Sequence, residues 1–135
     1  MTHFSQAPNQ PASFSRRVLL AVSGLSPQIV TETVYALATH PTAPFVPTEI
    51  HLITTREGAQ RAVLSLLSAD LGWFHRLCDD YRLPRIAFDH RHIHTMQDAN
   101  ARDLDDIRSI SDNQAAANFI TAQVRAFSAD LNCAL

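Results

Sequence analysis

The residues best suited to do chemistry lie in a short loop, residues 23–28, that directly follows a run of five apolar residues. Gly24 would let the backbone come close to a ligand, and Ser23 and Ser26 supply hydroxyl groups. If a helix begins directly after the loop, its first turn adds free backbone N–H groups with a partial positive charge. This combination suits a phosphate or a ribose hydroxyl, although the same residues would also serve a turn that only redirects the chain.

The common nucleotide and cofactor fingerprints are absent from the sequence. The chain has three glycines and no Gly-x-Gly-x-x-Gly run, which disfavours nicotinamide and flavin cofactors. All eleven basic residues are arginine, and a chain without lysine cannot form a P-loop. We therefore expect no cofactor and no lysine-dependent chemistry.

The apolar run before the loop, residues 18–22, is typical of a central strand in a parallel sheet, because neither of its faces carries a polar residue. Ser26 and Pro27 are predicted as the N-cap and first residue of the following helix. The last helix is expected to open at Ser111 with a capping-box spacing to Gln114. Hydrophobic periodicity predicts helices over 28–38, 59–67, 73–81 and 111–129, and strands over 49–54, from 86 and from 132. The alternation predicts an α/β fold, a Rossmann-like parallel sheet with flanking helices.

We expect one domain over residues 16–135, preceded by a disordered tail over residues 1–15, which is rich in Gln, Asn, Ser and Pro. A chain of 135 residues is long enough for one compact core and too short for two. Only the start of a fourth strand is expected near the end. The predicted sheet is therefore incomplete at the C-terminus, as in a fragment of a larger domain or in a chain that completes its sheet with another chain.

Two segments resemble a known family. Residues 18–33 read VLLAVSGLSPQIVTET, followed by YAL at 35–37, and they closely resemble the opening of CRISPR-associated Rossmann-fold (CARF) proteins of the ring-nuclease type. A second match is DDIR at residues 105–108, followed by DN at 112–113. The chain thus resembles the N-terminal part of a CARF domain.

The resemblance implies a homodimer that binds a cyclic oligoadenylate across the dimer face, with the tetra-adenylate ring favoured over the hexa-adenylate ring. Some members of the family only sense the ring and switch on an effector nuclease, and others cut it without a metal ion. In the cutting members the protein aligns a ribose 2′-hydroxyl with the next phosphorus, and the products end in 2′,3′-cyclic phosphates. Such catalysis depends on positioning and on electrostatic stabilisation of the transition state.

The resemblance also implies which residues form the site. Ser26 matches the family's serine before proline, which contacts the ring backbone near the scissile bond, and it is the candidate catalytic residue. Its neighbours match the ligand-binding residues Ser23, Gly24, Leu25 and Gln28. Arg108, in the second match, is a candidate phosphate contact. The family continues into a further strand and a Gly-Gly-Arg-Lys segment that faces the ring, and these 135 residues do not include that segment.

Two polar clusters have the residue types of metal sites. If residues 89–94 were extended, three histidines would share one face, but ligands along a straight strand spread over about 13 Å, too far apart to hold one ion. These histidines are His90, His92 and His94. Four aspartates could attract magnesium, but we expect them to cap helices and to be solvated, and they would repel an anionic ring. They are Asp103, Asp105, Asp106 and Asp112. We expect no metal site.

The predicted helix over residues 73–81 carries aromatic and apolar side chains at helical spacing. They include Trp73, Phe74, Leu77 and Tyr81. Such a set could form a base-stacking platform, but the spacing favours packing into the core.

The bulk composition limits the partners. A formal net charge of −2 and a pI near 6.3 give no positive field that would attract long nucleic acids. The sequence has no membrane-spanning stretch and no signal peptide, and its two cysteines are far apart, so we expect a cytoplasmic protein. Two alternatives stay open: a binding-only sensor or dimerisation module that controls a separate effector, and a small α/β enzyme that binds mononucleotides.

Overall fold

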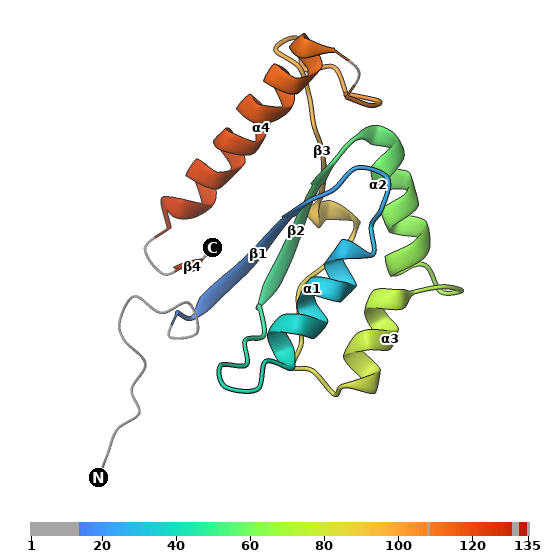
Figure 1. Ribbon diagram of the computed structural model, residues 1–135, viewed down its shortest axis with the longest axis vertical. Helices are drawn as coiled ribbons and strands as arrows, with labels where there is room; N and C mark the ends of the chain where they lie inside the picture. Colours follow the sequence, from blue (N-terminus) through green and yellow to red (C-terminus); the bar gives the residue numbers. More distant parts are fainter. Residues whose placement is uncertain (1–13, 108, 131–132, 135) are drawn as a thin grey trace.

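The computed structural model describes residues 14–107, 109–130 and 133–134 (Figure 1). In chain order its elements are β1 (Arg16–Val22), α1 (Ile29–Ala38), β2 (Glu49–Thr54), α2 (Arg56–Ala62), a π-helical turn (Val63–Leu67), α3 (Trp73–Asp80), a 3₁₀ turn (His90–His92), β3 (Ile93–Thr95), α4 (Ile110–Ser128) and β4 (Cys133–Ala134). The predicted tail falls almost entirely outside the described residues. None of the described helices is long and apolar enough to cross a membrane.

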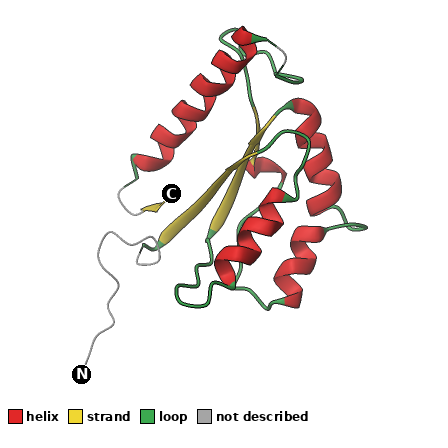
Figure 2. Ribbon diagram, in the orientation of Figure 1, coloured by secondary structure: helices red, strands yellow, loops and turns green. Residues whose placement is uncertain are grey.

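The strands form one parallel sheet in the order β3-β2-β1-β4. The two central strands pair along most of their length, from Val18 opposite Glu49 to Val22 opposite Ile53. The outer strands are shorter, and β4 pairs only with Arg16 and Arg17. Helices α1, α2 and α3 lie on one side of the sheet and α4 on the other (Figure 2). This arrangement confirms the predicted α/β fold with a parallel sheet and flanking helices.

The first face of the sheet, which α1, α2 and α3 cover, holds the larger apolar core. Alternation along β2 directs Ile50 and Leu52 to this face, and neither is exposed. Val30 and Val34 of α1, spaced one helical turn apart, pack on the same core and are equally inaccessible. This face therefore fixes the position of β1 and of the loop that follows it.

The second face, which α4 covers, is apolar at one end and polar at the other. Near the carboxyl ends of the strands, Ile53 packs with Met96, Leu104 and Ala116. Near the amino end of β2, the same alternation places Glu49 and His51 on this face instead. The two ends of α4 thus lie on chemically different surfaces.

The third strand begins later in the chain than predicted. Ile86 and Phe88 are buried, as a strand pattern requires, but this segment joins the sheet only through one isolated bridge between Ala87 and Glu49. The Asp89 carboxylate then accepts a hydrogen bond from the Arg91 N–H at 2.9 Å and caps a 3₁₀ turn. This local cap takes the chain out of the sheet until β3 begins.

Two predicted helix starts are also wrong in position. The N-cap position of α1 is Gln28, which makes no side-chain cap, because Pro27 and Gln28 form a turn ahead of the helix. The N-cap of α4 is Ser109, whose hydroxyl accepts a hydrogen bond from the Asp112 N–H at 3.1 Å. The predicted cap, Ser111, lies inside the helix.

The aromatic residues of α3 divide between the core and the surface. Phe74 is buried as predicted, whereas Trp73 is 51% exposed and Tyr81 is 50% exposed. The guanidinium of Arg76 covers the Trp73 ring at 4.9 Å, and Tyr81 meets Tyr35 edge to face at 5.3 Å. The prediction of core packing is therefore wrong for Trp73 and Tyr81, because only one side of α3 faces the sheet.

Candidate functional site

The predicted loop, residues 23–28, leaves the carboxyl end of β1, which is the upper end of that strand in Figure 1. Two hydrogen bonds attach it to the end of β2: the Ser23 N–H donates to the Ile53 carbonyl, and the Thr54 hydroxyl donates to the Gly24 carbonyl, both at 3.0 Å. Thr54 is fully buried, so its hydroxyl is held in place by the surrounding core. The start of the loop is consequently fixed relative to the sheet.

Two glycines next to this loop have opposite surroundings. A Cβ atom on Gly58, in the first turns of α2, would overlap the Thr54 hydroxyl and the Gly24 carbonyl. A Cβ atom on Gly24 would meet nothing within 4 Å, and Gly24 has no positive φ. Gly58 is therefore needed so that α2 can pack against the loop, whereas nothing in the described chain requires a glycine at position 24.

The loop presents polar groups that the rest of the fold leaves unused. The hydroxyl of Ser26 is exposed and makes no hydrogen bond within the described chain. The hydroxyl oxygen of Ser23 is buried and also has no hydrogen-bond partner among the described residues. Leu25 and Gln28 are exposed beside them. Arg108, the remaining predicted ligand contact, lies outside the described residues.

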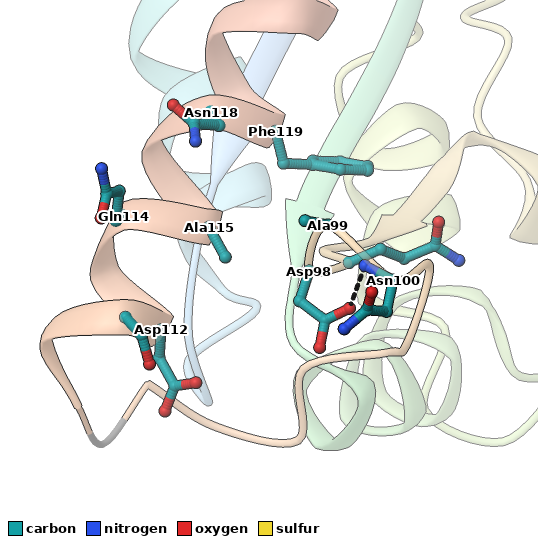
Figure 3. Close-up of a pocket in the computed structure, with 10 residues that line it drawn as sticks. Asp98, Ala99, Asn100, Asp112, Gln114, Ala115, Asn118 and Phe119 are labelled. Carbon is teal, nitrogen blue, oxygen red and sulfur yellow. Dashed lines mark hydrogen bonds between the residues drawn. The ribbon is translucent and has the colours of Figure 1, made fainter.

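A cavity of about 600 Å³ lies at the same edge of the sheet, between the loop after β3 and the first turns of α4 (Figure 3). Ala115 and Phe119 extend from α4 toward the loop, and Asp98 and Asn100 line the opposite wall. The remaining lining residues are Gln97, Ala99, Ser111, Asp112, Gln114 and Asn118. Four of the lining side chains are carboxamides, and none of those described is basic. The cavity can therefore hydrogen-bond a neutral polar group, but it offers no cation to a phosphate.

The wall formed by the loop after β3 is a compact turn. One Asp98 carboxylate oxygen accepts hydrogen bonds from the N–H groups of Asn100 and Arg102, at 2.8 and 3.1 Å. Further along, the Arg56 N–H donates to the Leu104 carbonyl at 2.9 Å, which attaches this segment to the start of α2. This cavity was not predicted from the sequence, because exposed polar residues in a turn produce no hydrophobic periodicity. The only indication was the density of Asn, Gln and Asp on both sides of residues 101–110.

The predicted acidic cluster is dispersed in the structure. Asp105 forms an ion pair with Arg56, with 2.6 Å between the guanidinium Nε and a carboxylate oxygen. Asp103 accepts a hydrogen bond from the Gln97 side chain at 3.2 Å. Within the described chain, no group of three or more His, Cys, Asp or Glu side chains could hold a metal ion.

The histidines that could have shared one strand face do not do so, because residues 90–92 form the 3₁₀ turn. His92 and His94 instead contact His51, a residue that sequence analysis did not identify, with ring centroids 4.3 and 5.1 Å apart. The His51 imidazole is also within hydrogen-bond distance of the Glu49 carboxylate, at 2.7 Å. Within the described chain, these histidines do not form a group that could hold a metal ion.

The charges around these histidines shift their protonation. The Arg16 guanidinium, with the His51 contact as a lesser cause, lowers the pKa of Glu49 to about 2. Burial lowers the pKa of His51, against the opposing effect of Glu49. Burial, together with the neighbouring imidazoles of His51 and His92, lowers the pKa of His94. The cluster therefore combines the ionised carboxylate of Glu49 with the neutral imidazoles of His51 and His94 at neutral pH.

Comparison with known proteins gives one match. The sequence model of a family described as CRISPR-associated protein NE0113 matches residues 26–135, a span that includes Ser26 and both walls of the cavity. Neither the comparison with curated proteins nor the comparison with solved structures gives a match.

Proposed function

We propose, from the premise that the chain belongs to the CRISPR-associated protein NE0113 family, that it binds a cyclic oligoadenylate at the carboxyl edge of its sheet and opens the ring without a metal ion. Membership of this family gives the chain a role in CRISPR defence. The ligand and the reaction are our proposal, and they follow from the likeness of residues 18–37 to CARF ring nucleases. The observation that carries the proposal is the state of the loop over residues 23–28.

The loop has the properties that a phosphodiester site needs. Ser26 offers an exposed hydroxyl without a partner in the described chain, and Ser23 adds a second unused hydroxyl oxygen. The following helix α1 begins without a side-chain cap, which leaves its first turn open to an anion. The space beside Gly24 lets a ligand approach the backbone. Because Thr54 holds the start of the loop in place, binding does not have to order it.

The neighbouring cavity supports a ligand with nucleoside parts. Its volume of about 600 Å³ is in the range of small-molecule sites. Carboxamides such as Asn118 can make paired hydrogen bonds with the N6 and N7 positions of adenine, and the Phe119 ring offers a stacking surface. A ring of alternating adenosines and phosphates has both kinds of group, the phosphate that the loop suits and the nucleoside that the cavity suits.

We propose that the active form is a homodimer joined at this edge, with the tetra-adenylate ring as the preferred ligand over the hexa-adenylate ring. Several large apolar side chains at the edge are exposed, which is costly in water unless they contact another surface. Ile110 is 87% exposed, and Val22, Leu25, Ile29 and Ile107 are between 37% and 47% exposed. A two-fold axis at this edge would cover these side chains and bring two loops to one ring.

In the proposed reaction a ribose 2′-oxygen attacks the adjacent phosphorus, the bond to the 5′-oxygen breaks, and the proton lost from the 2′-hydroxyl ends on the leaving 5′-oxygen. The products are 2′,3′-cyclic phosphate and 5′-hydroxyl ends, so atoms and charge balance without water or metal. The Ser26 hydroxyl donates a hydrogen bond to the phosphoryl oxygens and holds the attacking group in line. Its contribution is positioning and charge stabilisation.

The test uses radiolabelled cyclic tetra-adenylate in EDTA with the wild type, Ser26→Ala and the control Ser128→Ala. Ser128 is exposed at the far end of α4 from the cavity. We expect linear products with cyclic-phosphate ends from the wild type and the control, and a rate lower by about 10²–10³ in Ser26→Ala.

Other outcomes identify the alternatives. Retention of the ring without cleavage would leave a binding-only sensor. Equal competition by adenosine monophosphate would indicate a mononucleotide enzyme. If the protein neither retains nor cleaves the tetra- or the hexa-adenylate ring, the proposal is contradicted.

A further inference from the structure

Three imidazole rings stack on the second face of the sheet, beneath the C-terminal end of α4. His51 contacts the rings of both His92 and His94, with interplanar angles of 13° and 18°. The ring of Phe127, near the end of α4, lies 4.6 Å from His51. His51 is 8% exposed and Phe127 is 9% exposed. The proposed reaction uses none of these residues.

One set of tautomers satisfies every hydrogen bond in the stack, as the partners require. The Ile50 carbonyl can only accept, so His92, 2.9 Å away, must carry its proton on Nδ1. The ionised Glu49 carboxylate likewise requires a proton on Nε2 of His51. Nδ1 of His51 is then an acceptor, and Nε2 of His94, 2.8 Å away, is the donor. His51 and His94 are both neutral in this arrangement.

An added proton disrupts this arrangement. A proton on Nδ1 of His51 would make this buried ring a cation, and the hydrogen bond to His94, across 2.8 Å, would survive only if His94 moved its own proton from Nε2 to Nδ1. A proton on the other nitrogen of His94 would instead place a partly buried cation beside the other rings, and burial and like charge both oppose it. The contact with Phe127 would offset only a small part of the cost of a cation beside it.

The charged groups around the stack do not provide a new counter-ion. Arg16, from β1, forms hydrogen bonds and an ion pair with Glu49. It forms a further ion pair with Asp130, at 3.0 Å. The Arg16 guanidinium also lies 5.5 Å from the Phe127 ring. Glu49 is therefore already neutralised, and a second cation in the stack would meet Arg16 nearby. Among the described residues, the charged or titratable groups that interact with the imidazoles are Arg16, Glu49 and Asp89, which lies near His92 and already pairs with Arg91, while Asp130 acts through Arg16.

This cluster is also where the end of α4 is seated. Phe127 rests on His51, and Asp130, just after the helix, pairs with Arg16. Toward its other end, α4 is held by Ala116 in the apolar core and lines the cavity. The C-terminal half of the helix therefore depends on a contact with histidines, and the N-terminal half does not.

We infer that the stacked histidines form a proton-sensitive seat for α4, which holds the C-terminal half of the helix while the imidazoles are neutral and releases it as the pH falls below about 6.5. The direction follows from linkage: the released state binds more protons than the seated state, because its solvated histidines have ordinary pKa values. Acid therefore favours release, and each proton taken up changes the equilibrium by up to about tenfold per pH unit.

Hydrogen–deuterium exchange of the full chain between pH 7.5 and 5.0, corrected for the intrinsic exchange rate, tests this inference. We expect the opening equilibrium of the C-terminal half of α4 to rise by about tenfold or more per pH unit below pH 6.5. The opening equilibria of peptides from β2 and from the N-terminal half of α4 should rise much less. His51→Gln can still donate to Glu49 and accept from His94, but residue 51 can no longer take up a proton, so the pH dependence of its opening should be clearly shallower than that of the wild type.

Two further variants keep the test decisive. His75→Gln, at an exposed histidine of α3 on the opposite side of the sheet, should behave as the wild type. If His51→Gln does not fold by circular dichroism, His94→Gln, which removes the partly exposed second ring, should show a shallower pH dependence than the wild type. Exchange of α4 that does not change with pH in the wild type, or that changes equally in the wild type and in the folded histidine variant, overturns the inference.

Discussion

The two faces of the sheet use the same strand for different purposes. On the first face β2 contributes Ile50 and Leu52 to a core that is apolar throughout. On the second face the same strand contributes Ile53 at one end, and Glu49 and His51 at the other. The first face therefore stabilises the fold, while the second carries groups that can change their protonation. Mutations on the first face should therefore change stability by the same amount at every pH. Mutations at the polar end of the second face should change stability by an amount that depends on pH.

The largest expected effect comes from neighbouring residues of β2 on opposite faces. Leu52→Ala should lower the free energy of unfolding by about 4 kcal/mol, and Ile53→Ala by about 3 kcal/mol, because the core on the first face is the larger of the two. Urea unfolding at neutral pH measures both. A cost for Ile53→Ala equal to or above that for Leu52→Ala would contradict the ranking of the two faces.

Glu49→Gln tests the pH dependence of the second face. The Glu49 pKa is about 2 in the folded chain, below its ordinary value of 4.5, so the unfolded chain binds more protons between these values. The stabilisation is present above pH 4.5 and is lost as the pH falls toward 2. We expect the variant to be less stable by about 2 kcal/mol at pH 7 and by much less at pH 3. A cost that is the same at both pH values, measured by urea unfolding, would mean that packing rather than charge is responsible.

The two glycines at the loop form a matched pair. Gly58→Ala should cost about 2 kcal/mol, since the added methyl group overlaps Thr54 and the loop carbonyl of Gly24. Gly24→Ala should change stability by less than about 0.5 kcal/mol, because the space beside it is empty. If a ring ligand occupies that space, Gly24→Ala should also weaken its retention in a filter-binding assay. A stable Gly24→Ala that retains the ring as the wild type does would remove Gly24 from the proposed site.

The smallest expected effect concerns the start of α4. Ser109→Ala removes the side-chain cap and should cost about 1 kcal/mol in a thermal unfolding experiment. Ser111→Ala is the matched control, because among the described residues the Ser111 hydroxyl hydrogen-bonds only with the hydroxyl of Ser109, 3.0 Å away. An equal loss of stability in the two variants would support Ser111, the cap predicted from the sequence, over Ser109.

Sequence periodicity predicted most of the fold. The apolar run at residues 18–22, the strand over 49–54 and the helices around them follow from burial on one face or on two, and these positions are confirmed. The third strand was misplaced because Ile86 and Phe88 alternate as strand residues do, while a side-chain cap at Asp89 interrupts the strand. Local hydrogen bonds of this kind leave no trace in hydrophobicity.

The site was predictable only in part. The position of the Ser26 loop at the carboxyl end of a central strand follows from the α/β pattern, and its role as a ligand site stays a prediction. His51 was not identified because it sits in a strand that otherwise reads as apolar, and its partners at positions 92 and 94 come much later in the chain. The cavity was missed for the same reason, since its two walls come from segments that only the fold brings together.

Because α4 is long, it connects the two regions of the protein to which it is attached. Its 19 residues span about 28 Å, so the helix acts as a stiff rod that links the histidine seat to the wall of the cavity. If the rod pivots on its apolar contact at Ala116, about 9 Å from its first residue, a tilt of about 10° moves the end beside the cavity by about 1.5 Å. A change too small to unfold anything at one end of the rod would therefore alter the dimensions of the cavity at the other.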